Sequence, residues 1–186
     1  MHLFRDSLAL LFVAAGLAAC SDEPPAAPEP APPEPVASTC GDVGALQGTL
    51  SGAINVDLDW SDHDLRCESM PRPDARGVRI RLSGDIGQER LAVIIALPDL
   101  KPGLTGSEVD SIVTIGVDGS GRFFSTANLG TCWVNVTTNA PLAGSSGLYN
   151  VVGELSCVGP LGEFNGDAFI DIRALRFSGL ADWGTS

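Results

Sequence analysis

The sequence is poor in the residues that carry most catalytic chemistry. It contains two histidines, of which His2 lies in an apolar N-terminal segment, and a single lysine, Lys101. A zinc site built from several histidines is therefore excluded. Pro102 follows Lys101, so the phosphate-binding G-x-x-x-x-G-K-[ST] loop is absent. The G-x-S-x-G, H-E-x-x-H and G-x-G-x-x-G patterns of hydrolases, metalloproteases and dinucleotide-binding domains do not occur either.

Positive charge is equally scarce. The chain has 186 residues, with 23 acidic residues against 11 basic ones and a net charge of −12 at pH 7. Nucleic-acid binding depends on clustered lysine and arginine, and no such cluster occurs. We therefore exclude nucleic acid as a partner. The length suits one ordinary domain with an appendage.

The N-terminus has the pattern of an export signal. An apolar run over residues 8–19 is too short to span a bilayer as a mature helix but suits a signal-peptide core. It ends in Leu17-Ala18-Ala19-Cys20, which resembles the lipobox of bacterial lipoproteins. The resemblance covers residues 1–20 and implies that residues 1–19 are removed and that Cys20 is acylated, which would anchor the chain to a membrane. An ordinary secretory signal is the alternative.

The resemblance also implies a location. In envelopes with two membranes, lipoproteins that carry Asp directly after the acylated cysteine are typically kept at the inner membrane. Here that position is Ser21, with Asp22 one place later. We therefore expect the protein in the cell envelope, at the outer membrane and facing the periplasm.

Residues 20–39 have the composition of a tether. Seven prolines fall between residues 21 and 39, with Ala and Glu in most of the gaps. Such a segment buries too little apolar surface to offset the entropy of ordering it. Repeated proline favours polyproline II at about 3.1 Å per residue, so this segment could reach roughly 60 Å. A proline-rich ligand for another domain is the alternative.

From Cys40 to residue 186, a period of two predicts strands. In residues 54–60 apolar side chains alternate with Asn55, Asp57 and Asp59, the pattern of a half-buried strand. The same pattern between turn-forming residues predicts further strands in residues 78–82, 91–97, 113–117, 123–124, 132–136, 151–157 and 168–177. We predict an all-β domain, an antiparallel β-sandwich or small barrel of about eight strands. Residues 169–177 are the one stretch whose spacing would also fit a short helix.

Four cysteines remain after Cys20, and in an exported protein they are expected to form two disulfides. Cys132 and Cys157 are placed symmetrically about the turn-rich residues 141–147, so a hairpin with that turn would bring them opposite each other. Cys40 would then pair with Cys67. A metal site or redox dithiol is the alternative, although no C-x-x-C spacing supports it.

Asp57, Asp59, Asp62 and Asp64 place four carboxylates within eight residues. Calcium takes six to eight oxygen ligands, so this cluster is the candidate calcium site, although it lacks the glycine and terminal glutamate of an EF-hand loop. A bound cation would stabilise the fold by mass action. The alternative is a solvated strand face followed by an Asp-rich turn.

Two further candidates are single side chains. Trp133 alternates away from Cys132 and Val134, so it should face the opposite side of its strand and is the candidate recognition aromatic. His63 could act as a general base for Ser61 or Ser69, but sequence neighbours rarely form such constellations.

Beyond residue 20 the sequence resembles no family of known activity. We therefore expect a lipid-anchored envelope domain that acts as a non-enzymatic binding or structural module, with an envelope protein or glycan as partner. The alternatives are a calcium-stabilised adhesion or ligand-binding domain and a carboxylate-dependent hydrolase, in which two acids of separated pKa would meet in a pocket.

Overall fold

The computed structural model describes residues 39–71, 76–126 and 130–183. The chain divides into two units, Met1–Pro35 and Val36–Ser186, and all of the described residues belong to the second. Their elements are β1 (Ala45–Gly52), β2 (Val56–Ser61), the 3₁₀ turn η1 (Asp62–Asp64), β3 (Arg66–Pro71), β4 (Val78–Ile86), β5 (Glu89–Leu97), β6 (Gly106–Asp118), β7 (Arg122–Ser125), β8 (Cys132–Pro141), β9 (Leu148–Cys157), β10 (Leu161–Glu163) and β11 (Phe169–Asp182). The predicted all-β, antiparallel class is confirmed.

All the strands belong to one antiparallel sheet. Its main path runs β2-β1-β11-β10-β7-β6-β5-β4-β3, and β8 and β9 bridge β6 to β11 beside it. Along β11, one edge pairs with β1 while the other pairs first with β10 and then with β9. Along β6, one edge pairs with β5 while the other pairs with β8 and then with β7. β10 and β9 thus follow one another along one edge of β11, and β8 and β7 follow one another along one edge of β6.

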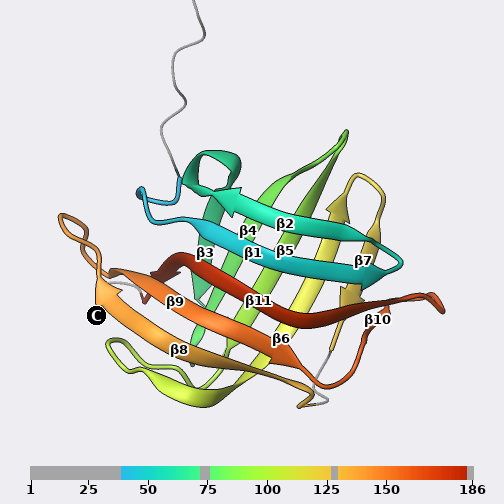
Figure 1. The fold of residues 1–186 in the computed structure, drawn as a ribbon. Helices are drawn as coiled ribbons and strands as arrows, with labels where there is room; N and C mark the ends of the chain where they lie inside the picture. The colour runs from blue at the N-terminus through green and yellow to red at the C-terminus, as the bar shows by residue number, and fades with distance from the viewer. Residues whose placement is uncertain (1–38, 72–75, 127–129, 184–186) are drawn as a thin grey trace, which may run out of the picture. The chain divides into compact units, whose positions relative to one another are not determined.

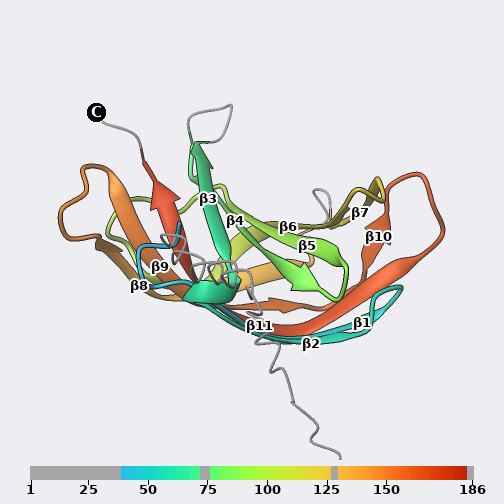
Figure 2. The ribbon, with the colours of Figure 1, turned by 90° about the horizontal axis from the view of Figure 1, so that it is seen from above.

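The sheet folds over into two layers. Figure 1 shows β2, β1, β11, β9 and β8 passing across the front of β3–β7, and Figure 2 shows the same two layers from above. One face of each layer is buried: Ile80, Leu91, Ile115 and Phe124 come from the back layer and meet residues such as Phe177 from the front. Alternation of buried and exposed residues along each strand therefore builds a single core.

The C-terminal half of β11 closes the fold against β3 and β4. The Asp182 backbone N–H donates to Ser69 Oγ at 2.6 Å. A Cβ at Gly179 would lie 2.7 Å from Ile80 Cγ2, so the close approach of these strands requires glycine there. The last strand thus holds the two layers together at this end.

A β-bulge in β11 shifts its side-chain phase. Residues 173 and 174 are both exposed and face the single residue Thr49, because the register jumps between Gly48 and Leu50 of β1. Ile172 before the bulge and Leu175 after it therefore both point into the core. This irregular spacing is the reason that residues 169–177 could also be read as a short helix.

The described residues form eleven strands where the sequence pattern gave about eight. The three additional strands are β1, β3 and β10. β1 carries Gly48 at the bulge, β3 alternates charged residues with Cys67 and ends at Pro71, and β10 has only three residues. None offers the run of alternating apolar side chains on which the prediction rested.

Both predicted disulfides are present. Cys132 and Cys157 are directly opposite each other on β8 and β9, with their Cα atoms 4.1 Å apart, as the symmetry about the intervening turn predicted. Cys40 pairs with Cys67 and links the segment before β1 to β3. Each bridge closes a loop of similar length, 27 and 25 residues apart in sequence, which corresponds to about 3–4 kcal/mol of stabilisation in the chain-entropy account.

Gly84 provides a test of the packing between β2 and β4. A Cβ there would lie 2.8 Å from Trp60 Cδ2, whereas a Cβ at Gly162 of β10 would meet nothing within 4 Å. We expect Gly84→Ala to lower the free energy of unfolding by about 1–3 kcal/mol through overpacking. Gly162→Ala, the matched control, should stay within about 0.5 kcal/mol of the parent. Urea unfolding of both variants decides the point, and equal midpoints would show that the indole does not pack on β4.

Candidate functional site

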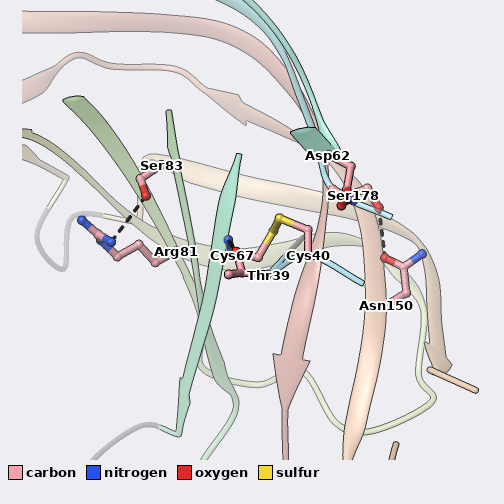
Figure 3. The surroundings of a disulfide bond; sticks show 9 residues. Thr39, Cys40, Asp62, Cys67, Arg81, Ser83, Asn150 and Ser178 are labelled. Carbon is pink, nitrogen blue, oxygen red and sulfur yellow. Dashed lines mark hydrogen bonds between the residues drawn. A yellow bond between two sulfur atoms is a disulfide. The ribbon is translucent and has the colours of Figure 1, made fainter. Parts of the chain in front are cut away.

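The candidate site is a polar pocket beside the Cys40–Cys67 disulfide, with a cavity volume of about 440 Å³. Three elements form it: the turn η1, the start of β3 and the β4–β5 hairpin. Figure 3 shows the disulfide with Thr39, Asp62 and Ser83 around it. The pocket is lined by Thr39, Asp62, His63, Asp64, Leu65, Arg66, Cys67, Glu68, Ser83, Gly84, Asp85 and Arg90.

Contacts between distant parts of the chain fix the wall nearest the disulfide. The Cys67 backbone N–H donates to Thr39 Oγ1 at 2.9 Å, and the Gly44 N–H donates to Asp62 Oδ1 at 3.2 Å. A Cβ at Gly44 would lie 2.6 Å from that of Cys40, so the chain can turn this closely only with glycine. The disulfide and these two hydrogen bonds hold the segment before β1 against η1 and β3.

A capping box shapes the turn η1. The Asp64 carboxylate accepts hydrogen bonds from the Ser61 backbone N–H at 3.0 Å and from Ser61 Oγ at 2.7 Å. These bonds, the one from the backbone first, lower the pKa of Asp64 from its ordinary value, because they stabilise the ionised carboxylate. Asp64 is therefore ionised at neutral pH and holds the turn that presents His63.

Ion pairs satisfy several of the charges in and near the pocket. Arg90 Nε lies 3.0 Å from Asp85 Oδ1 across the β4–β5 hairpin, and this hydrogen bond raises the pKa of Arg90. Arg81 lies 3.0 Å from Glu68 and 3.3 Å from Asp118. Because Arg81 is shared by two carboxylates, this side of the pocket keeps one net negative charge.

Three polar groups of the lining have no partner within the described residues. Asp62 Oδ2 is buried without a hydrogen bond in this part of the chain. The side chains of His63 and Arg66 are exposed and make no described hydrogen bond or ion pair. The exposed His63 and Arg66 are therefore the groups that the pocket offers to a polar ligand, beside carboxylates that are already bonded.

The four aspartates of the candidate calcium site do not converge. Asp57 accepts a hydrogen bond from Thr49 Oγ1 at 2.6 Å and Asp59 one from Gln47 Nε2 at 2.9 Å, both on the exposed face of β1 and β2. Asp62 accepts from the Gly44 N–H and Asp64 from Ser61. In the described ranges no three His, Cys, Asp or Glu side chains are grouped so that they could hold a metal ion. Calcium binding thus stays a prediction from the sequence, without support from the geometry.

The hydrolase alternative gains no support from the described residues. Ser61 Oγ is bonded to Asp64, and Ser69 Oγ is bonded to the Arg79 carbonyl and the Asp182 N–H, so neither hydroxyl is paired with His63. The carboxyl groups whose pKa is displaced, Asp64 and Glu163, are both displaced downward by hydrogen bonds. A carboxylic acid held protonated near neutral pH would need a pKa displaced upward.

The remaining predicted residues are placed as follows. Trp133 is half-buried on the face of β8 opposite Cys132 and Val134, both of which are buried. Its strand neighbours are Asp110 and Ser156, so it lies far along the sheet from the pocket-lining residues. Cys20 lies outside the described residues, and its acylation stays a prediction.

The sequence pattern had not indicated Arg66, Asp85 or Arg90 as site residues. Asp85 and Arg90 flank the Gly-containing turn between β4 and β5, and opposite charges at the two ends of a hairpin turn are a readable signal of a cross-strand pair. Arg66 gave no such signal, because its place beside Ser83 in the pocket wall depends on the pairing of β3 with β4.

Comparison of the chain with protein-family models, with curated proteins and with solved structures finds no match. No helix in the part of the chain that the structure describes is long and apolar enough to cross a bilayer.

The lowered pKa of Asp64 makes the stability of the fold depend on pH. A carboxyl group whose folded pKa is lowered stabilises the fold above its unfolded pKa, near 3.9, and this contribution is lost as the pH falls through the folded value. We expect Asp64→Ala to lower the melting temperature at pH 7 and to approach the parent below about pH 3.

Asp110→Ala, at an exposed aspartate of β6, is the control and should show no such convergence. Thermal unfolding between pH 2 and pH 7 gives the comparison. A constant difference between Asp64→Ala and the parent over this range would contradict the role of the ionised carboxylate.

Proposed function

We propose that this protein is a lipid-anchored β-domain of the bacterial cell envelope that acts as a non-enzymatic binding or structural module. The single observation that carries the proposal is the order of its parts. A lipobox-like Leu17-Ala18-Ala19-Cys20 precedes a proline-rich tether, which precedes a disulfide-linked β-domain. This order suits a domain tethered to the membrane in which its N-terminus is anchored.

The disulfides support an exported location. Disulfides persist in oxidising compartments such as the periplasm and are rare in the bacterial cytosol. Both bridges of the domain are buried against its core, with Cys40 and Cys132 almost fully enclosed. Ser21 after the acylated cysteine favours the outer membrane, facing the periplasm.

The pocket beside the Cys40–Cys67 disulfide is the binding surface we propose. Its uncommitted side chains are the exposed His63 and Arg66, whereas Glu68 and Asp85 are in ion pairs and Asp64 accepts from Ser61. Donors beside carboxylates fit a hydroxyl-rich or zwitterionic partner, such as an envelope glycan or a polar peptide segment. The binding energy would come from these polar contacts, because the walls carry few apolar side chains.

Replacement of the acylated cysteine tests the anchor. Cys20→Ser should abolish the mass gain from acyl chains and move the protein from the membrane fraction to the soluble fraction. The change leaves both disulfides intact, because Cys20 takes part in neither. Fractionation and intact-mass measurement of both forms give the result. A variant that stays in the membrane fraction would refute the proposed lipid anchor at Cys20.

A photo-reactive residue tests the binding half. Placed at Arg66, on the pocket wall, it should give covalent adducts with an envelope component in intact cells. Placed at Ser51, which is exposed on β1, it should give none above background. Mass analysis of the purified protein detects adducts with proteins and glycans alike. Equal labelling from both positions would count against the pocket as the binding surface.

A further inference from the structure

Three large apolar side chains are exposed at one end of the sheet. Phe123 on β7, Phe164 after β10 and Phe169 at the start of β11 are 49%, 74% and 50% exposed. Figure 2 shows β7, β10 and the start of β11 side by side at this end. Phe124 and Phe177, by contrast, are almost completely buried. Exposed aromatic side chains gathered in one place mark an interaction surface.

The strand register places the three rings on one face. The Phe164 N–H donates to the Phe123 carbonyl at 2.8 Å, which continues the pairing of Gly162 with Ser125 and Glu163 with Phe124. Phe124 points into the core, so its neighbour Phe123, and Phe164 opposite, point outward.

Phe169 shares this outward face. It pairs with Gly162, while the next pair, Ile170 with Leu161, is fully buried and points into the core. Gly162 has no side chain and nothing within 4 Å of its Cβ position, so the surface between the rings is open. Phe123, Phe164 and Phe169 are called the phenylalanine patch below.

The two rows of β5 and β6 beside the patch carry no charge. Phe123 lies across Gly116 of β6, which pairs with Ala92 of β5, and in the next row Ile94 pairs with Thr114. The acids nearest Phe169 in the chain are Asp167 and Asp171, which precede and follow it. The patch therefore has an uncharged surface on its β5–β6 side.

The chain outside the described residues indicates what covers this face. It leads from Thr39 back to Cys20, the residue that the proposed function places in a bilayer, so the inference rests on that proposed function. Those residues could span roughly 60 Å as polyproline II, a length that keeps the domain close to the lipid surface. Because the anchor keeps the domain within this distance of the bilayer, the effective concentration of lipid at the patch is high. Three aromatic side chains therefore suffice for a second, weak contact.

We propose that the phenylalanine patch docks on the lipid bilayer in which Cys20 is anchored. Phenylalanine rings enter the boundary between headgroups and acyl chains through the hydrophobic effect, and the uncharged β5–β6 surface beside Phe123 adds no cost of desolvating an ion. The net charge of −12 disfavours an anionic surface, so the bilayer that binds is one of zwitterionic lipid. Docked in this way, the domain lies against the membrane instead of standing away from it.

The test attaches the protein to vesicles chemically. In the chain from Cys20 to residue 186, the other four cysteines are in disulfides, so the Cys20 thiol of unacylated protein can be joined selectively to a maleimide lipid in phosphatidylcholine vesicles. Phe164→Trp places a fluorescent reporter in the patch, and Leu104→Trp places one at a residue of the β5–β6 loop that is 55% exposed. Brominated acyl chains then quench whichever tryptophan enters the bilayer, and the unsubstituted protein supplies the background.

We expect the fluorescence added by Phe164→Trp to be quenched at least about twofold more than that added by Leu104→Trp, with a shift to shorter wavelength. Addition of Phe123→Ser and Phe169→Ser should abolish the excess quenching, and circular dichroism checks that this variant is folded. Equal quenching of the two reporters would overturn the proposal. So would a patch-dependent dimer of the vesicle-free protein in sedimentation, because a second copy would then be the occupant.

The chemical linkage separates this inference from the proposed function. If cells do not acylate Cys20, the fractionation experiment fails while the vesicle experiment can still succeed. If the patch does not touch lipid, the vesicle experiment fails while Cys20→Ser still releases the protein from membranes.

Discussion

The two-sided pairing of β11 is the constraint on which the fold depends. This strand has 14 residues and pairs with β1 on one edge and with β10 and β9 on the other. A slip of one residue on either edge would turn Leu175 and Phe177 out of the core and Phe169 into it. The bulge opposite Thr49 absorbs the change of side-chain phase within β11. Core, disulfide placement and the exposed face at β7 and β10 all follow from this register.

Much of the β-domain could be predicted because its signals are local. Alternation of side chains is visible over a few residues, and the symmetry of Cys132 and Cys157 about one turn required only a hairpin. β3 could not be predicted in the same way, because its charged residues Arg66 and Glu68 face solvent and few apolar side chains alternate with them. The outward orientation of Phe169 could not be predicted for a related reason, because it depends on pairing with β10, a strand of three residues.

The residues of the pocket were harder still to predict from local sequence patterns. The cluster of aspartates predicted a common site, yet each carboxylate accepts from a donor of its own: Thr49, Gln47, Gly44 and Ser61 in turn. Local hydrogen bonds are available to every aspartate in a turn or beside a strand, whereas a shared cation needs several of them to approach against mutual repulsion. The groups left without partners, Asp62 Oδ2 and Arg66, are brought to the pocket by contacts between distant segments, which no local pattern encodes.

The Cys40–Cys67 disulfide also determines how the domain would bear a mechanical load. A pull along the chain at Thr39 reaches Cys40 and passes through the sulfur atoms into β3, while β1, β2 and η1 lie inside the covalent loop that the bridge closes. Those elements are thereby shielded from the force and cannot be peeled from the sheet one hydrogen bond at a time. The load falls instead on β3, which is held by its ladder to β4 and by the Ser69 contact with β11. Reduction of this one bond would move the point of loading to β1.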